Sequence, residues 1–410
     1  MDLSLYTNFA NNIAQQETQI NTLQQQISTG VSVQTPDQNP AAFETATIGN
    51  DQISALTSDT TTQADIQSQL GSVSNTYGSV TSLLNNLQSV MIQALNGTTS
   101  ADNMKSLATQ VSAAGQELLG FANSTGPEGT YLFAGSRGTL QPFQTNGSGN
   151  VVYVGDGGQS LANVAPNTTV ASIANGEVFM TGGGGDGYSS VTANQNNKGT
   201  GVLISQGVVN QAKAAAFQSS ASAPPGGPIT LTFHGAPPNL TYTATQGSAA
   251  VPIGSGSGSA KSGKTLQLKG MDFELNGTPG SGDTFTISPS RPQSMFSLVQ
   301  SIYTTMSQAG TSAAQVAQTN QALNNDLSAL QGYQQSVAMA QAQNGVTLQA
   351  VSNAGTSNAS QQTSVQTAVQ SAVGVNMPTA ISTLDETMTA LQAAMAAFGG
   401  VQKLSLFNYL

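Results

Sequence analysis

The chain contains no cysteine and no tryptophan, and only 7% of its residues are charged. Without cysteine there is no disulfide, no thiolate nucleophile and no thiolate metal ligand, and the redox state of the compartment is left open. Nine Lys and Arg residues are outnumbered by 19 Asp and Glu residues, which gives a formal net charge of −10. Because nucleic-acid binding needs a clustered basic surface, so few scattered cations argue against a nucleic-acid partner.

Long apolar runs are missing as well. No stretch approaches the roughly 18 apolar residues that a membrane-spanning helix needs, so no membrane segment is predicted. The N-terminus has no basic region followed by a continuous apolar region, and it therefore lacks the pattern of a cleaved secretory signal. We expect the protein either to stay in the cytoplasm or to leave by a route that recognises an uncleaved terminus.

Residues that support catalysis or metal binding are equally scarce. His234 is the single histidine, so Ser/His/Asp catalysis would depend on one loop imidazole beside Gly235. No cluster of histidines and carboxylates offers a metal site. The glycine run that ends at Asp186 resembles a calcium-binding repeat, but such repeats bind by stacking and here there is one copy. We predict no enzyme activity and no cofactor.

The segment Gly258–Thr265 matches the phosphate-loop pattern G-x-x-x-x-G-K-[ST]. A phosphate loop needs a buried strand before it and a helix after it, whose N-terminal amides meet the anion. Here a Gly/Ser repeat precedes the motif and strand-like alternation follows it. We interpret the segment as a flexible β-loop. An NTP-binding enzyme is kept as an alternative, which nucleotide binding lost on Lys264→Ala would support.

What the chain does have is an apolar repeat at each end. In both repeats apolar residues recur at alternating steps of four and three, which is the spacing of a coiled-coil seam, and Gln16 is the one polar residue at a seam position. We predict that the two ends lie side by side as helices and supply an assembly interface. The predicted interface residues are Tyr6, Phe9, Ile13, Ile20, Leu23, Ile27, Met377, Ile381, Leu384, Met388, Leu391, Met395, Phe398, Leu404, Leu406 and Phe407.

Burial of these seams is predicted to be barely sufficient to order them. Some six bulky residues per helix contribute on the order of 10 to 20 kcal/mol, at roughly 1.5 to 3 kcal/mol each. Ordering about 30 backbone positions costs roughly 1 to 2 kcal/mol apiece, and helical hydrogen bonds return only part of that cost. We therefore expect both ends to be poorly ordered in the free monomer and to become helical when neighbouring subunits cover their remaining faces.

Between the ends, a helical period brackets a region of different composition. Gly30 is predicted to end the first helix, and Asn39 and Pro40 are predicted to be the N-cap and the first helical residue of the second. The predicted helices cover residues 3–29, 41–96, 100–123, 293–306 and 323–373, and residues 129–143 are interpreted as a short hairpin.

Residues 144–290 are rich in Gly, Pro and Thr and carry the short alternating runs of antiparallel strands. The predicted strands are 151–154, 177–180, 229–233, 240–243, 265–268, 271–275 and 284–287, with 201–217 interpreted as a helix. The predicted fold class is α+β: an elongated helical bundle or coiled coil, formed by both chain ends and the middle helices, with an inserted antiparallel β domain. The predicted domains are residues 1–35 plus 376–410, residues 36–143 plus 290–375, and residues 144–289.

Several of these segments resemble the flagellin family of bacterial axial proteins, and within it the hook-associated proteins of the hook–filament junction. The segments that carry the resemblance are Gln26–Gly30 and Pro36–Ala42, similar to the STG and DDP-A-A signature, then Phe121–Ser124 with Gly129–Ser136, Gly282–Ile287 and Leu404–Leu410. The resemblance runs end to end over the terminal and helical parts and is weak over 144–280. Two positions depart from the family pattern: Val31–Val33 replaces basic residues and Asn39 replaces an acidic one.

The resemblance implies a structural adaptor without catalysis at the bacterial flagellar hook–filament junction. It implies export through the flagellar type III apparatus without a cleaved signal peptide, and an extracellular location. The implied partners are the hook-side hook-associated protein (FlgK-type), flagellin, a flagellar export chaperone and further copies of the chain in a ring. Two alternatives remain. One is flagellin itself, against which residues 132–135 argue, and the other is a secreted adhesin-like protein.

Overall fold

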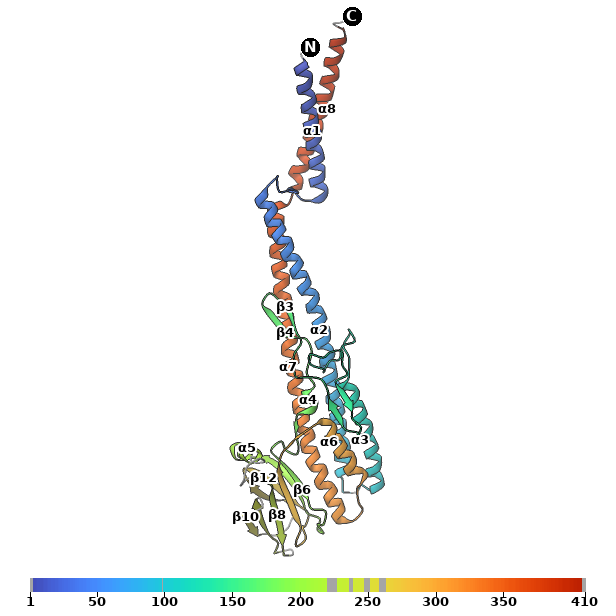
Figure 1. The fold of residues 1–410 in the computed structure, drawn as a ribbon, viewed down its shortest axis with the longest axis vertical. Helices are drawn as coiled ribbons and strands as arrows, with labels where there is room; N and C mark the ends of the chain where they lie inside the picture. Colours follow the sequence, from blue (N-terminus) through green and yellow to red (C-terminus); the bar gives the residue numbers. More distant parts are fainter. Residues whose placement is uncertain are drawn as a thin grey trace. The chain divides into compact units, whose positions relative to one another are not determined.

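The computed structural model describes residues 3–97, 99–219, 227–235, 239–246, 251–257 and 263–407 (Figure 1). The chain divides into two compact units: unit 1 comprises residues 1–63, 164–168 and 353–410, and unit 2 comprises residues 64–163 and 169–352. Helices α2 (Pro40–Leu95) and α7 (Ala313–Val373) contribute to both units. Within the described ranges, no helix combines the length and apolar character needed to cross a membrane.

Unit 1 is helical, and its helix boundaries agree with the sequence signals. Helix α1 (Leu3–Thr29) ends at Gly30, which has a φ of 71°, a conformation that glycine adopts at little cost. Asn39 caps α2, because its Oδ1 accepts a hydrogen bond of 3.1 Å from the Ala42 N–H. Helix α8 (Met377–Phe407) completes the unit, and both chain ends lie at the same end of the α1–α8 pair (Figure 1).

A short antiparallel bridge joins two segments of unit 1, the one that follows α1 and the one that precedes α8. Val31 pairs with Gly374, the Ser32 N–H donates to the Val373 carbonyl at 2.7 Å, and the Val375 N–H donates to the Gly30 carbonyl at 3.0 Å. The chain therefore leaves α1 and enters α8 at one shared point. That point sets the level at which the two terminal helices begin to pair.

Unit 2 has a helical core to which α3 (Ala101–Ala122) and α6 (Met295–Ser307) contribute with parts of α2 and α7. Ser100 and Ser294 cap α3 and α6 by accepting from the backbone N–H three residues later. The strands β1 (Phe143–Thr145) and β2 (Val151–Tyr153) and the short helix α4 (Glu177–Met180) close one side of this core. Four phenylalanine rings meet there, with centroids 5.1 to 6.4 Å apart: Phe133, Phe143, Phe179 and Phe296.

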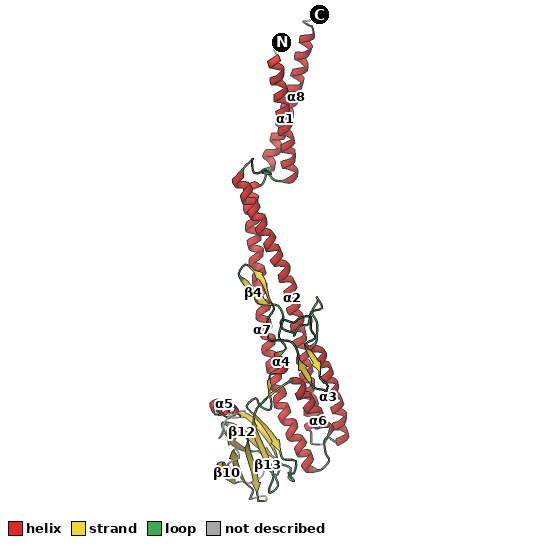
Figure 2. Cartoon of the chain, in the orientation of Figure 1, coloured by secondary structure: helices red, strands yellow, loops and turns green. Residues whose placement is uncertain are grey.

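A second core lies between the strands that follow, shown in yellow in Figure 2. One antiparallel sheet has the order β10 (Val251–Ser257), β9 (Thr241–Gln246), β8 (Ile229–His234), β13 (Thr284–Pro289), β6 (Ser189–Ala193). Another has the order β11 (Lys264–Leu268), β12 (Met271–Asn276), β7 (Val202–Val208). The remaining elements are the pairs β3 (Leu161–Ala165) with β4 (Thr168–Ala171) and β5 (Gly182–Gly183) with β14 (Pro292–Gln293), and helix α5 (Gln211–Ser219).

Amide side chains of α7 hold the two edge strands β6 and β7. Gln321 is 2% exposed, and its amide forms both hydrogen bonds of Leu203, accepting from the N–H at 2.6 Å and donating to the carbonyl at 2.8 Å. Asn325 Oδ1 accepts from the Val191 N–H at 3.0 Å. An edge strand otherwise leaves a row of unpaired backbone groups. The amides satisfy several of these groups and attach the β core to a helix.

Three sequence predictions in unit 2 are wrong. Residues 177–180, predicted as a strand, form α4, with Gly176 and Thr181 as its caps. This short helix buries Phe179 in the helical core. Residues 201–217, predicted as one helix, form strand β7 followed by α5. The hairpin predicted over 129–143 is a series of turns with an isolated bridge between Thr125 and Tyr131, and the regular ladder joins β1 to β2.

Candidate assembly interface

The terminal helices α1 and α8 lie side by side, as the sequence predicts, and they run antiparallel. Phe9 stacks on Phe398 with ring centroids 5.0 Å apart and an interplanar angle of 12°, and Tyr6 approaches the same ring at 5.3 Å. At the other end of the pair Val31 meets Gly374. These two anchor points fix one register along the whole pair.

The inner face of α1 matches its predicted seam. Its seam residues are half-buried, whereas the polar residues between them are mostly exposed: Phe9, Ile13, Gln16, Ile20, Leu23 and Ile27. Tyr6 lies at the open end and is 51% exposed. Gln16 Oε1 is buried and has no hydrogen-bond partner among the described residues. An unpartnered buried acceptor weakens the pair by about 1 to 3 kcal/mol.

The structure divides the predicted seam of α8 between two faces. The less exposed face contains Leu384, Leu391 and Phe398, together with three small residues that the sequence analysis missed: Ala380, Thr387 and Ala394. These six again follow steps of four and three. The other predicted seam residues form an exposed row: Met377 (40%), Ile381 (46%), Met388 (39%) and Met395 (49%). We call this row the outer face of α8.

Leu404, Leu406 and Phe407 belong to α8 by their backbone, but their side chains lie outside the described residues. The first residues of the phosphate-loop-like segment, 258–262, also lie outside them, and Lys264 and Thr265 begin strand β11. The strand that the sequence predicts after this motif is therefore present. His234 lies at the end of β8, where its Nε2 is 3.2 Å from the Thr243 hydroxyl.

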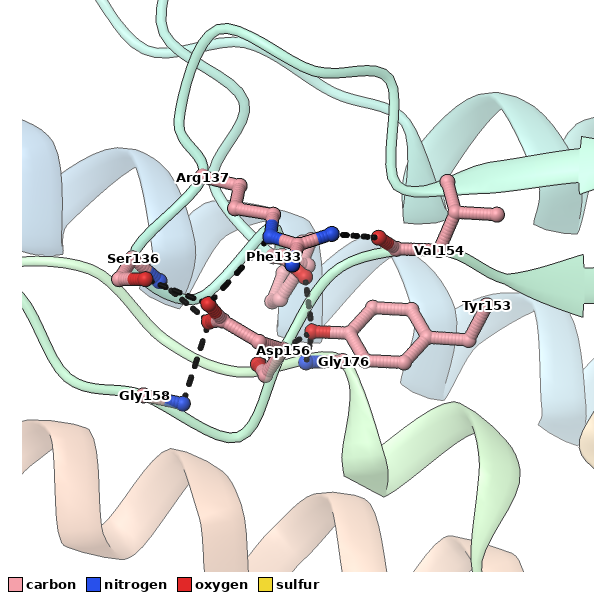
Figure 3. Close-up of polar contacts among 8 residues, drawn as sticks. All are labelled: Phe133, Ser136, Arg137, Tyr153, Val154, Asp156, Gly158 and Gly176. Carbon is pink, nitrogen blue, oxygen red and sulfur yellow. Dashed lines mark hydrogen bonds and ion pairs between the residues drawn. The ribbon is translucent and has the colours of Figure 1, made fainter.

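A loop in unit 2 is organised by Asp156 (Figure 3). Its Oδ1 accepts from the backbone N–H of Ser136 at 2.7 Å and of Gly158 at 3.1 Å, and its Oδ2 accepts from the Ser136 hydroxyl at 2.5 Å. Arg137 adds an ion pair at 3.7 Å. The Ser136 hydrogen bond is the main cause that lowers the pKa of Asp156 below its ordinary value.

The Tyr153 hydroxyl contacts the backbone of the same loop. It lies 3.1 Å from the Phe133 carbonyl and 2.9 Å from the Asp156 carbonyl, and it accepts from the Gly176 N–H at 3.1 Å (Figure 3). Burial raises the pKa of Tyr153, so the phenol stays protonated and able to donate. The loop thereby holds Phe133, which is fully buried, in the aromatic cluster of the helical core.

Replacing Gly135 by alanine is expected to destabilise unit 2 by about 2 to 4 kcal/mol. Gly135 has a φ of 68°, and an added Cβ would lie 2.1 Å from the Asp156 carbonyl oxygen. Gly138→Ala in the same loop is the matched control, since its added Cβ would make ordinary contacts with Ile173 at 3.4 Å. Urea unfolding followed by circular dichroism measures both. Equal stability of the two variants would contradict the prediction.

The chain is similar to proteins of the bacterial flagellum. Residues 2–137 match the family of the bacterial flagellin N-terminal helical region. Flagellar hook-associated protein 3 of Escherichia coli is 35% identical over 120 residues, which are 29% of this chain and 38% of that protein. The chain thus matches well under half the length of this relative.

Solved structures extend the similarity over most of the chain. FlgL of Xanthomonas campestris is 26% identical, with a TM-score of 0.68 over 78% of this chain and 99% of that one. Hook-associated protein 3 of Legionella pneumophila is 25% identical, with a TM-score of 0.70 over 79% of this chain and 98% of that one. The antiparallel sheets inserted between long helices are therefore part of a shared fold.

Proposed function

We propose that this chain, a flagellin-family protein similar to hook-associated protein 3, is a non-catalytic structural adaptor at the hook–filament junction. The observation that carries the proposal is the agreement of its fold with FlgL over nearly the whole of each solved FlgL chain. Among the described residues, no group of three His, Cys, Asp or Glu lies together as a metal site would require. The feature that the proposal has to explain is the long helical fold that the chain shares with FlgL.

In this proposal the terminal helices make the assembly contacts. Residues 1–35 and 376–410 form the inner domain of a ring, residues 36–143 and 290–375 the middle domain, and residues 144–289 the outer domain. The α1–α8 pair leaves the outer face of α8 exposed, and an apolar row of this kind suits packing against a neighbouring helix. The hook-side partner is a FlgK-type protein, the filament-side partner is flagellin, and copies of the chain adjoin one another around the ring.

The route to that position is also part of the proposal. The chain is exported by the flagellar type III apparatus without a cleaved signal peptide, accompanied by an export chaperone. Both terminal helices become fully ordered only when neighbouring subunits cover them, because a helix pair with a narrow apolar seam gains little stability on its own. Long neighbouring helices that slide past one another would let the junction join a bending hook to a stiffer filament.

A deletion strain tests the function. The expected result is hooks without filaments, flagellin released into the medium, and filament growth restored by the natural gene. Labelled protein is expected in a few copies at the base of each filament. Thousands of copies along each filament would instead identify a flagellin, and normal motility with binding by residues 144–290 would identify an adhesin.

A further inference from the structure

Methionine is the readily oxidised residue type of this chain, which has 11 methionines, no cysteine, no tryptophan and one histidine. Half of the ten methionines in the described region are inaccessible: Met91, Met271, Met295 and Met306 are 0% exposed and Met104 is 5% exposed. The exposed methionines among the described residues are Met339 on α7 and the three of the outer face of α8. Three of four exposed thioethers thus gather on one helix.

These three methionines share one line along α8. Met377 and Met388 are 11 residues apart and Met388 and Met395 are seven apart, and both separations are close to whole numbers of helical turns. Ile381 lies on the same line and completes an apolar row. The side of α8 that contacts α1 uses leucine, phenylalanine, alanine and threonine, with no methionine. Unbranched thioethers are therefore confined to the side that the chain itself does not cover.

We infer that Met377, Met388 and Met395 are a modification site, a row of thioethers that peroxide converts to sulfoxides in the free subunit and that docking protects. In each step the sulfur gains one oxygen atom from the peroxide, which is reduced to water, while methionine is oxidised to methionine sulfoxide. The product is polar where the thioether was apolar. Three such changes on one line turn the outer face of α8 from an apolar row into a polar one.

The consequence for assembly rests on the proposed function. A helix that packs against the outer face buries the row, and a buried sulfoxide oxygen without a donor opposes burial. Oxidised free subunits are thus unable to dock, whereas docked subunits are covered and stay reduced. The outer face of α8 acts as a check that only undamaged chains enter the assembly.

Peptide mapping of the purified full-length protein after exposure to hydrogen peroxide tests the chemistry. Met377, Met388 and Met395 are expected to oxidise at least tenfold faster than Met271, Met295 and Met306, and Met339 is expected to oxidise as an exposed reference. Equal rates for the row and the buried methionines would overturn the assignment. This measurement needs no partner and is independent of the junction role.

Addition of purified protein to filament-less hooks of the deletion strain tests the consequence. Peroxide-treated natural protein is expected to restore filament growth at least tenfold less than untreated protein. The variant carrying Met377→Leu, Met388→Leu and Met395→Leu keeps an apolar row without thioethers, so treatment is expected to leave its activity equal to that of the same variant untreated. Met339→Leu is expected to lose activity on treatment as the natural protein does. Two results would overturn the assembly effect: equal restoration of filament growth by treated and untreated natural protein, or loss of the triple variant's activity on treatment. If untreated natural protein fails to restore filament growth, the proposed function is overturned and the assembly effect with it. The peptide map of oxidation would still decide whether the three methionines are a modification site.

Discussion

Replacing Asp326 by asparagine is expected to stabilise unit 2 at pH 8 by about 2 to 4 kcal/mol and to leave its stability at pH 4 nearly unchanged. Asp326 lies on α7 and is 5% exposed. Its carboxyl accepts from the Ser301 hydroxyl of α6 at 3.0 and 3.3 Å, and among the described residues it forms no ion pair. Burial raises the pKa of Asp326 to about 7, against a smaller lowering by the Ser301 hydrogen bond.

The sign of the pH effect follows from that raised pKa. Between about pH 4, where an unfolded aspartate titrates, and pH 7, the folded chain binds more protons than the unfolded chain. Stability of unit 2 therefore falls as pH rises through this window, and the loss is complete above about pH 7. Asparagine has no proton to lose and still accepts from Ser301, so the variant lacks this slope.

Urea unfolding of the natural chain and the variant at pH 4.5, 6 and 8 measures the effect. Burial also raises the pKa of the core Tyr77 to about 12, so the ionisation of this phenol does not interfere over this range. Asp65→Asn, at an exposed position of α2, removes the same formal charge and is the matched control. Parallel pH profiles for the natural chain and Asp326→Asn would show that the carboxyl is hydrated in the folded protein and would refute the prediction.

The helices could be predicted from the sequence because their signals are local. Gly30, Asn39 and Pro40 mark helix ends through their own backbone preferences, and the structure confirms each of them. The fold class is confirmed in the same way, by long helices around antiparallel sheets. Element type and order, which depend on short stretches of chain, were thus accessible without a structure.

Partner choice on α8 could not be predicted in the same way. The bulkiest residues define the seam in the sequence, but the structure turns Met377, Ile381, Met388 and Met395 outward and uses Ala380 and Ala394 beside Leu391. Small side chains give a weak hydrophobic signal, yet they allow two helices to approach closely. Which of two adjacent apolar faces meets α1 depends on the other helix. The role of the outer face in assembly accordingly remains a prediction.

The predictions made from short apolar runs in the β region were wrong for a related reason. Glu177–Met180 and Val202–Val208 are each compatible with helix or strand by periodicity alone. Their structures are decided by distant partners: Phe179 fits among the aromatic rings of the helical core, and β7 pairs with β12. The backbone groups of Leu203 also find their partner 118 residues away, in Gln321. No local pattern carries that information.

Replacing Phe398 by alanine is expected to open the outer end of the α1–α8 pair. Phe398 is the ring that both Phe9 and Tyr6 contact, at 5.0 and 5.3 Å, and Phe9 is half-buried. Truncating a half-buried ring and losing two aromatic pairs costs about 2 kcal/mol or more. Because Gln16 already leaves a buried acceptor unpartnered in the same seam, little stability remains to hold the first turns of α1.

Amide hydrogen exchange on the full-length chain separates this effect from a general loss of structure. Exchange over residues 6–16 is expected to accelerate roughly 30-fold in Phe398→Ala, which corresponds to about 2 kcal/mol, while residues 64–95 keep their protection. Met395→Ala removes an exposed side chain of the adjacent outer face, one turn before Phe398, and should leave α1 unchanged. If α1 already exchanges without protection in the natural chain, the pair forms only in the assembly, as the narrow seam allows. In that case Phe398→Ala should instead reduce incorporation at hooks at least tenfold, because its ring contacts would then be needed when the subunit docks.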